Sequence, residues 1–99
     1  MSNKLKHFDK ITKEGRDLFA RKANDYGGTL DNISMTGLSG IAVRLVDKIA
    51  RLHSLTNGVE QKVKDESIRD TLIDISNYGK IGVLLLDGVW DKSHKEDQK

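Results

Sequence analysis

Two stretches of this chain carry charged and polar side chains at helical spacing. Asp70, Asp74 and Asn77 are separated by four and three residues, so they would share one face of a helix. Two carboxylates one helical turn apart can bind a hard cation such as Mg²⁺. A second stripe at helical spacing is mostly cationic, and it consists of Arg44, Asp47, Lys48 and Arg51. Its arginine and lysine side chains can donate charge-assisted hydrogen bonds to phosphate oxygens.

These stripes have two interpretations, and both stay open on spacing alone. The first is a pair of solvated helix faces, whose exposed ion pairs contribute between nothing and about 1 kcal/mol each. The second is a site for a nucleotide phosphate, in which the cations hold phosphate oxygens and the carboxylates place Mg²⁺. Spacing by itself favours the solvated faces. The sequence contains no Walker-type loop and no recognisable Ser, His and Asp arrangement.

The composition excludes several classes of protein. Lysine and arginine number 17 and aspartate and glutamate 15, and the net charge of +2 is too small for a general nucleic-acid-binding protein. Without cysteine the chain can form no disulfide, zinc–thiolate site or thiol nucleophile. It has no apolar run of the about 20 residues that span a bilayer, and its first residues lack the apolar block of a secretory signal. We therefore expect a cytoplasmic protein with no membrane partner.

The elements that would position these residues are helices. With 32% charged residues, no proline and apolar residues at helical spacing, the sequence predicts an all-α fold in one domain over residues 1–90. Three main helices are expected, over about residues 3–23, 39–56 and 65–87. The glycine-rich residues 24–40 form the long first connection, which is either a functional loop or contains a short buried helix. Residues 91–99 are expected to be a disordered charged tail.

The second and third helices are expected to form an antiparallel hairpin, because only about eight residues connect them. Their polar stripes can then approach each other. The expected core side of the second helix consists of Ala42, Leu45, Val46, Ile49 and Leu52. The segment IGVLLL, residues 81–86, is apolar on all sides, which favours a subunit interface in a helical-bundle homo-oligomer. Gly15 suggests the close approach of another backbone, and Trp90 is expected to seal an apolar patch.

Three segments, in order along the chain, resemble the first type of nucleotide-modification-associated domain, a family of phages and bacteria formerly of unknown function. They contain Lys22, Asp25, Tyr26 and Gly27, then Arg44, Leu45, Asp47, Lys48, Arg51 and Leu52, then Asp70, Thr71, Leu72, Asp74, Asn77 and Tyr78. The resemblance spans most of residues 5–86. It implies an all-α fold, an association with phage nucleotide metabolism and DNA-base modification, and the bacterial host cytoplasm as the location if a phage encodes the protein.

The chain more distantly resembles the MazG-type nucleotide pyrophosphohydrolases. That resemblance implies Mg²⁺ held on carboxylates of two neighbouring helices, and dimers or tetramers. The superfamily uses a Glu-x-x-Glu pair and a Glu-x-x-Asp pair. This sequence has Asp47 alone on the second helix, with Asp70 and Asp74 on the third.

Together, the stripes and the resemblances imply a small oligomeric protein that binds a nucleotide or a nucleotide-derived phosphate ligand. The expected ligand-binding residues are Lys22, Asn24, Asp25, Tyr26, Gly27, Arg44, Lys48, Arg51, Asn77 and Tyr78. Asp47, Asp70 and Asp74 would hold Mg²⁺ if the protein is a nucleoside triphosphate pyrophosphohydrolase. One alternative is a non-catalytic sponge for a host immune signal, cyclic or of ADP-ribose type. A third function is a protein-interaction module that uses the apolar end of the third helix.

Overall fold

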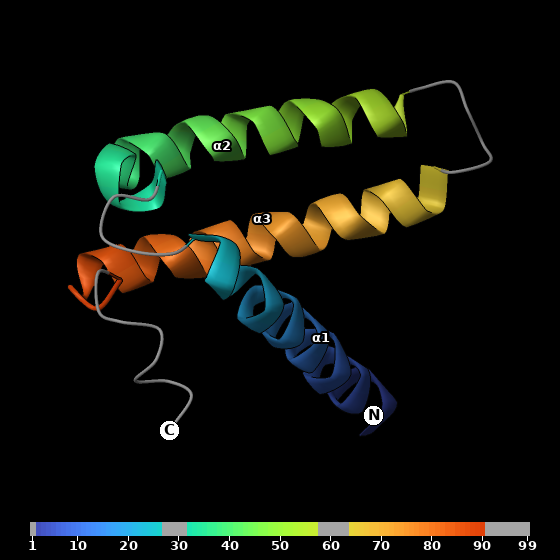
Figure 1. The fold of residues 1–99 in the computed structure, drawn as a ribbon. Coiled ribbons are helices and arrows are strands. Elements are labelled where there is room, and N and C mark those ends of the chain that lie inside the picture. Colours follow the sequence, from blue (N-terminus) through green and yellow to red (C-terminus); the bar gives the residue numbers. More distant parts are fainter. Residues whose placement is uncertain (1, 27–31, 58–63, 91–99) are drawn as a thin grey trace.

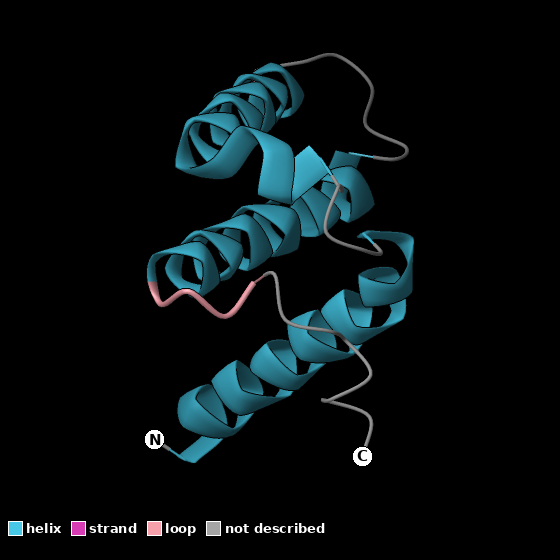
Figure 2. Cartoon of the chain, turned by 60° about the vertical axis from the view of Figure 1, so that its left-hand side comes forward, coloured by secondary structure: helices cyan, strands magenta, loops and turns pink. Residues whose placement is uncertain are grey.

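The structure, a computed structural model, describes residues 2–26, 32–57 and 64–90, and these ranges contain three helices and no strand. The helices are α1 (Ser2–Tyr26), α2 (Asn32–Thr56) and α3 (Lys64–Leu86). In both views α3 lies between α2 and α1 (Figure 1, Figure 2). The helices α2 and α3 run antiparallel, and α1 crosses α3 obliquely with its N-terminal half projecting away (Figure 1). The predicted all-α fold and antiparallel hairpin are confirmed.

The first connection is shorter than the glycine-rich composition suggested. The helix α1 continues to Tyr26, and α2 already begins at Asn32. Of the two open interpretations, the short buried helix is confirmed in part: residues 32–36 are helical and bury Ile33, but Met35 is 69% exposed and Leu30 lies outside the described residues. Gly37 then kinks α2 with φ 61° and ψ −151°, a conformation almost confined to glycine. Residues 27–31 and the expected tail, residues 91–99, lie outside the described residues.

The best-packed part of the core lies at one end of the hairpin. Its buried residues are Ile33, Ile41, Ile81 and Trp90. Gly82 is also buried here, and a Cβ added to it would lie 3.7 Å from Ile41 Cγ2. The absence of a larger side chain at residue 82 therefore lets α2 and α3 lie close together.

The chain turns back after α3 and brings Trp90 onto this core. Gly88, with φ 72°, donates a hydrogen bond to the Leu85 carbonyl at 3.1 Å, and Val89 donates one to the Leu84 carbonyl at 3.1 Å. This pair of bonds is the Schellman arrangement that ends many helices. The Trp90 ring then lies 6.1 Å, centroid to centroid, from the Phe19 ring of α1. The prediction that Trp90 seals an apolar patch is confirmed.

The predicted core side of α2 is partly wrong. Val46 and Ile49 are 66% and 52% exposed, and Ala42 is exposed as well. Leu45, which was predicted, and Ile41, which was not, pack in the core that α2 shares with α3. The reason is that α1 packs on α3 rather than on α2, so only one edge of the apolar side of α2 is covered.

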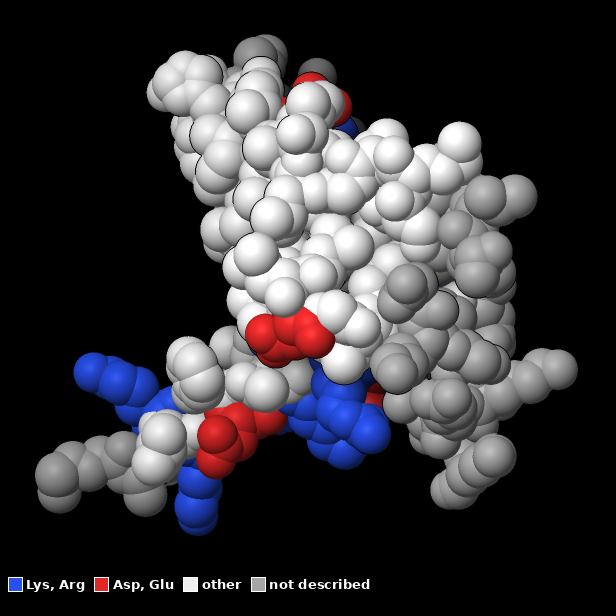
Figure 3. Space-filling model, turned by 90° about the vertical axis from the view of Figure 1, so that its left-hand side faces the viewer, with Lys and Arg blue, Asp and Glu red and all other residues white. Residues whose placement is uncertain are grey.

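The apolar end of α3 is only partly enclosed by the chain itself. Ile81 and Gly82 are buried, whereas Val83 and Leu86 are exposed. An end-on view shows this end of the hairpin as a mostly uncharged surface, with most of the charged side chains in view on the projecting α1 (Figure 3). The homo-oligomer stays a prediction. None of the described helices is long and apolar enough to cross a membrane.

Candidate functional site

Asp74 lies where the three helices meet. Its Oδ2 atom is 3.1 Å from Nζ of Lys48 on α2, and its Oδ1 atom is 4.0 Å from Nζ of Lys22 on α1. The Asp74 side chain is 23% exposed, and those of Lys48 and Lys22 are 30% and 48% exposed. The predicted approach of the two polar stripes is therefore confirmed at this point. Lys22, which was expected among the ligand-binding residues, comes to this point from α1.

A cavity of about 340 Å³ opens between α1 and α3 beside this carboxylate. Its lining is mostly charged and consists of Glu14, Arg21, Lys22, Asp70 and Asp74, with the apolar Leu18 and Ile73. The polar face predicted for α3 is thus neither fully solvated nor turned only to α2, because α1 covers part of it. A charged cavity of this kind can take a small polar anion whose oxygens accept hydrogen bonds from the cations.

An ion pair between Glu14 and Arg69 holds α1 across α3 next to this cavity. The Arg69 guanidinium donates to both carboxylate oxygens of Glu14, with Nη2 at 2.9 Å from Oε1. This hydrogen bonding to Arg69 is the main reason that the pKa of Glu14 lies below its ordinary value of 4.5. The pair is half-exposed, so solvent weakens it, but it links α1 directly to α3.

Asn77 joins α3 to α1 on the other side of the crossing. Its Nδ2 atom donates a hydrogen bond to the Gly15 carbonyl at 3.1 Å. A Cβ added at Gly15 would lie 3.2 Å from Asn77 Oδ1 and 3.8 Å from Ile73 Cγ2. Gly15 is closely approached, as predicted, but by the side chains of Asn77 and Ile73 and not by another backbone. Part of the Asn77 amide is therefore used in helix packing.

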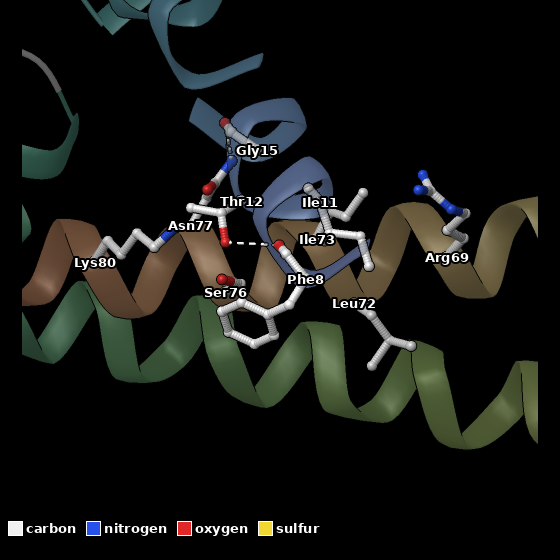
Figure 4. A pocket seen from close by; sticks show the side chains of 10 residues that line it. All are labelled: Phe8, Ile11, Thr12, Gly15, Arg69, Leu72, Ile73, Ser76, Asn77 and Lys80. Carbon is white, nitrogen blue, oxygen red and sulfur yellow. Dashed lines mark hydrogen bonds between the residues drawn. The ribbon is translucent and has the colours of Figure 1, made fainter. Parts of the chain in front are cut away.

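Asn77 also borders a second cleft of about 240 Å³ between α1 and α3, shown in Figure 4. The cleft is walled by Phe8, Ile11, Leu72 and Ile73, with Ser76 and Lys80 among its polar residues. Figure 4 shows Asn77 reaching from α3 toward Gly15 of α1, between this cleft and the backbone of α1. The cleft carries much less charge than the cavity beside Asp74 and offers mainly apolar contact.

The remaining predicted binding residues lie in different surroundings. Arg44 is half-buried on α2, and its Nη1 atom is buried without a hydrogen-bond partner among the described residues. Arg51 is exposed, and Tyr78 packs against the hydrophobic core. Residues 24–26 lie in the last turn of α1 and Gly27 beyond it, where the structure does not describe the side chains.

The three predicted metal ligands do not converge. Asp47 and Asp70 are exposed on α2 and α3, and both oxygens of Asp74 face ammonium groups. In the part of the chain that the structure describes, no three His, Cys, Asp or Glu residues are grouped so that they could hold a metal ion. The arrangement of these residues therefore does not fit a Mg²⁺ site held by the protein alone.

Sequence reasoning missed Glu14, Arg21 and Arg69. Glu14 could have been found from the sequence. Residues 14, 18 and 22 are four apart, so Glu14 lies on the same face of the helix as Lys22. Nothing in the sequence indicates that Arg69 pairs with Glu14, since that contact depends on the angle at which α1 crosses α3.

The fold and this meeting point define a class, an all-α protein in which charged residues from three helices converge. Residues 22–86 match the model of the family described as nucleotide modification associated domain 1. The match covers more than half of the 99 residues, so the chain belongs to this family. Comparison with curated proteins and with solved structures gave no match. The similarity to MazG-type enzymes stays a prediction.

Proposed function

We propose that the protein binds a nucleotide or nucleotide-derived phosphate ligand at Lys22 and Lys48. One observation carries this proposal: each of the three segments in which the sequence resembles the family, all within the matched residues 22–86, contributes one side chain to a single point, Lys22, Lys48 and Asp74. Successive members of this group are 26 positions apart in the chain, so local helix stability does not require them to meet. A shared ligand is a reason for three distant segments to supply charges to one place.

The chemistry of the cavity supports a phosphate. Arg21 and Lys22 line the cavity, and Lys48 lies next to it through its ion pair with Asp74; all three can donate charge-assisted hydrogen bonds to phosphate oxygens. The volume of about 340 Å³ lies within the range of roughly 300–1,000 Å³ that is usual for small-molecule sites. The family description, nucleotide modification associated domain 1, favours a nucleotide as the source of the phosphate.

The arrangement favours binding without hydrolysis. A Mg²⁺-dependent pyrophosphohydrolase needs carboxylates grouped around a metal ion, and the described residues include no group of three His, Cys, Asp or Glu that could hold one. Ligand capture needs only cations and a cavity, which are present. A sponge for a host immune signal of cyclic or ADP-ribose type is the form of this function that requires no turnover.

A retention assay tests the proposal. The protein is incubated with Mg²⁺ and a panel of nucleoside triphosphates, cyclic nucleotides and ADP-ribose, and the ligand is chromatographed before and after heat denaturation. We expect one ligand to be retained intact and released only by heating. Lys48→Met should abolish retention, and Lys6→Met, an exposed lysine near the start of α1, should not. Release of pyrophosphate or a monophosphate would instead establish a hydrolase, and no retention of any nucleotide would overturn the proposal.

A further inference from the structure

A single carboxylate stands between the two lysines of the proposed site. Asp74 faces Nζ of Lys48 at 3.1 Å and Nζ of Lys22 at 4.0 Å, and its side chain is mostly buried. The groups proposed to bind phosphate therefore already have a counter-ion within the protein. We propose that Asp74 competes with the ligand for these lysines and so sets the charge that the bound phosphate can carry, favouring a monoanionic phosphodiester over a dianionic terminal phosphate. This inference rests on the proposed function.

The charges around the cavity lead to this preference. The cations near it are Arg21, Lys22 and Lys48, and the carboxylates are Asp70 and Asp74, because Glu14 is neutralised by Arg69. The cations thus exceed the free carboxylates by one. The group of Lys22, Lys48 and Asp74 taken alone has the same excess, a single positive charge. One phosphodiester, with one negative charge, balances that excess.

A terminal phosphate monoester matches the single positive charge of Lys22, Lys48 and Asp74 less well than a diester does. A phosphate monoester carries between about 1.5 and 2 negative charges at pH 7. Its oxygens would have to approach both lysines while Asp74 stays close by, and each negative charge on the phosphate is repelled by that carboxylate. Because Asp74 is mostly buried, solvent screens this repulsion less than it would screen a surface pair. Asp74 therefore reduces what the second charge of a monoester gains from the lysines, while the removal of that charge from water still costs free energy, so a diester is favoured.

Removal of the Asp74 charge should change this selectivity in a measurable way. Titration calorimetry would compare the 5′-monophosphates and the 3′,5′-cyclic monophosphates of the four common bases, which differ in phosphate charge within each matched pair. We expect the wild-type protein to bind the cyclic member of the best pair more tightly. Asp74→Asn should tighten binding of the 5′-monophosphate by about tenfold more than that of its cyclic partner.

Asp70→Asn is the matched control, because Asp70 lines the same cavity but is exposed. It should change the ratio of the two affinities much less. An equal change of the affinity ratio in both variants would overturn the role of Asp74. Weaker binding of both nucleotides to an Asp74→Asn protein that keeps its melting temperature would overturn it as well. If Asp74→Asn does not fold, the wild-type ratio decides: a preference for the 5′-monophosphate overturns the inference. Binding of no nucleotide by folded wild-type protein would refute the proposed function itself.

Discussion

The side-chain amide of Asn77 on α3 donates a hydrogen bond to the carbonyl oxygen of Gly15 on α1 at 3.1 Å. A Cβ at Gly15 would lie only 3.2 Å from the Oδ1 atom of the same amide. The missing side chain at Gly15 therefore lets α1 approach α3 closely. Because α1 carries Lys22 and α3 carries Asp74, this contact helps to position two members of the proposed site.

The contact between Asn77 and Gly15 should appear as a coupling energy. Asn77→Ala is expected to lower the free energy of unfolding by about 1 kcal/mol through loss of the hydrogen bond. Gly15→Ala gains about 1 kcal/mol of helix propensity but crowds Asn77, so it should be nearly neutral alone and stabilising in the Asn77→Ala background. Urea denaturation of the wild-type protein, the two single variants and the double variant measures the coupling energy between the two residues. Strictly additive effects would mean that the two residues do not interact in solution.

The kink in α2 should depend on glycine at residue 37. Gly37 has φ 61° and ψ −151°, which a residue with a Cβ adopts only at a cost of roughly 1–3 kcal/mol. Gly37→Ala should therefore lower the melting temperature followed by circular dichroism. The control is Gly79→Ala in α3, where an added Cβ meets none of the described atoms within 4 Å and should stabilise the protein by roughly 0.5–1 kcal/mol. Shifts of the same sign in both variants would contradict the assigned backbone conformation.

Sequence reasoning identified the helices better than the faces they bury. Periodicity shows where apolar residues recur, and it found all three helices and the hairpin. It does not show which helix covers a face: Val46 and Ile49 are apolar and exposed, whereas the polar Asp74 is mostly buried beneath two other helices. The meeting of Lys48 with Asp74 was predictable from the short connection of the hairpin. The position of Lys22 was not, because it depends on the crossing angle of α1.

The Glu14–Arg69 ion pair should make stability depend on acidic pH. Hydrogen bonding from Arg69 lowers the pKa of Glu14 below 4.5, so the folded protein favours the ionised carboxylate. The stabilisation is therefore fully present above that pH and is lost as the pH falls below it. Urea denaturation between about pH 7 and pH 3 should show a steeper acid loss of stability for wild-type protein than for Glu14→Gln.

A second acidic residue provides the control for this pH effect. The pKa of Asp17 is also lowered, chiefly by a hydrogen bond from Lys13, but that pair lies within α1 and joins no two helices. Asp17→Asn should therefore reduce the acid dependence without loosening α1 from α3. Parallel pH profiles for wild-type protein and Glu14→Gln would show that the Glu14–Arg69 pair does not form in solution.

Ligand binding should reduce the motion of α1 relative to α2 and α3, because the two proposed phosphate-binding lysines lie on α1 and α2. The nucleotide retained in the chromatographic assay is expected to slow hydrogen exchange of amides in the C-terminal half of α1. Arg69→Met removes the ion pair that orients α1, so a smaller fraction of the protein holds Lys22 in place and the apparent affinity should fall several-fold. Lys13→Met, which breaks the exposed pair within α1, should leave the affinity unchanged. Equal affinities in the two variants, with unaltered exchange in α1, would show that α1 does not take part in binding.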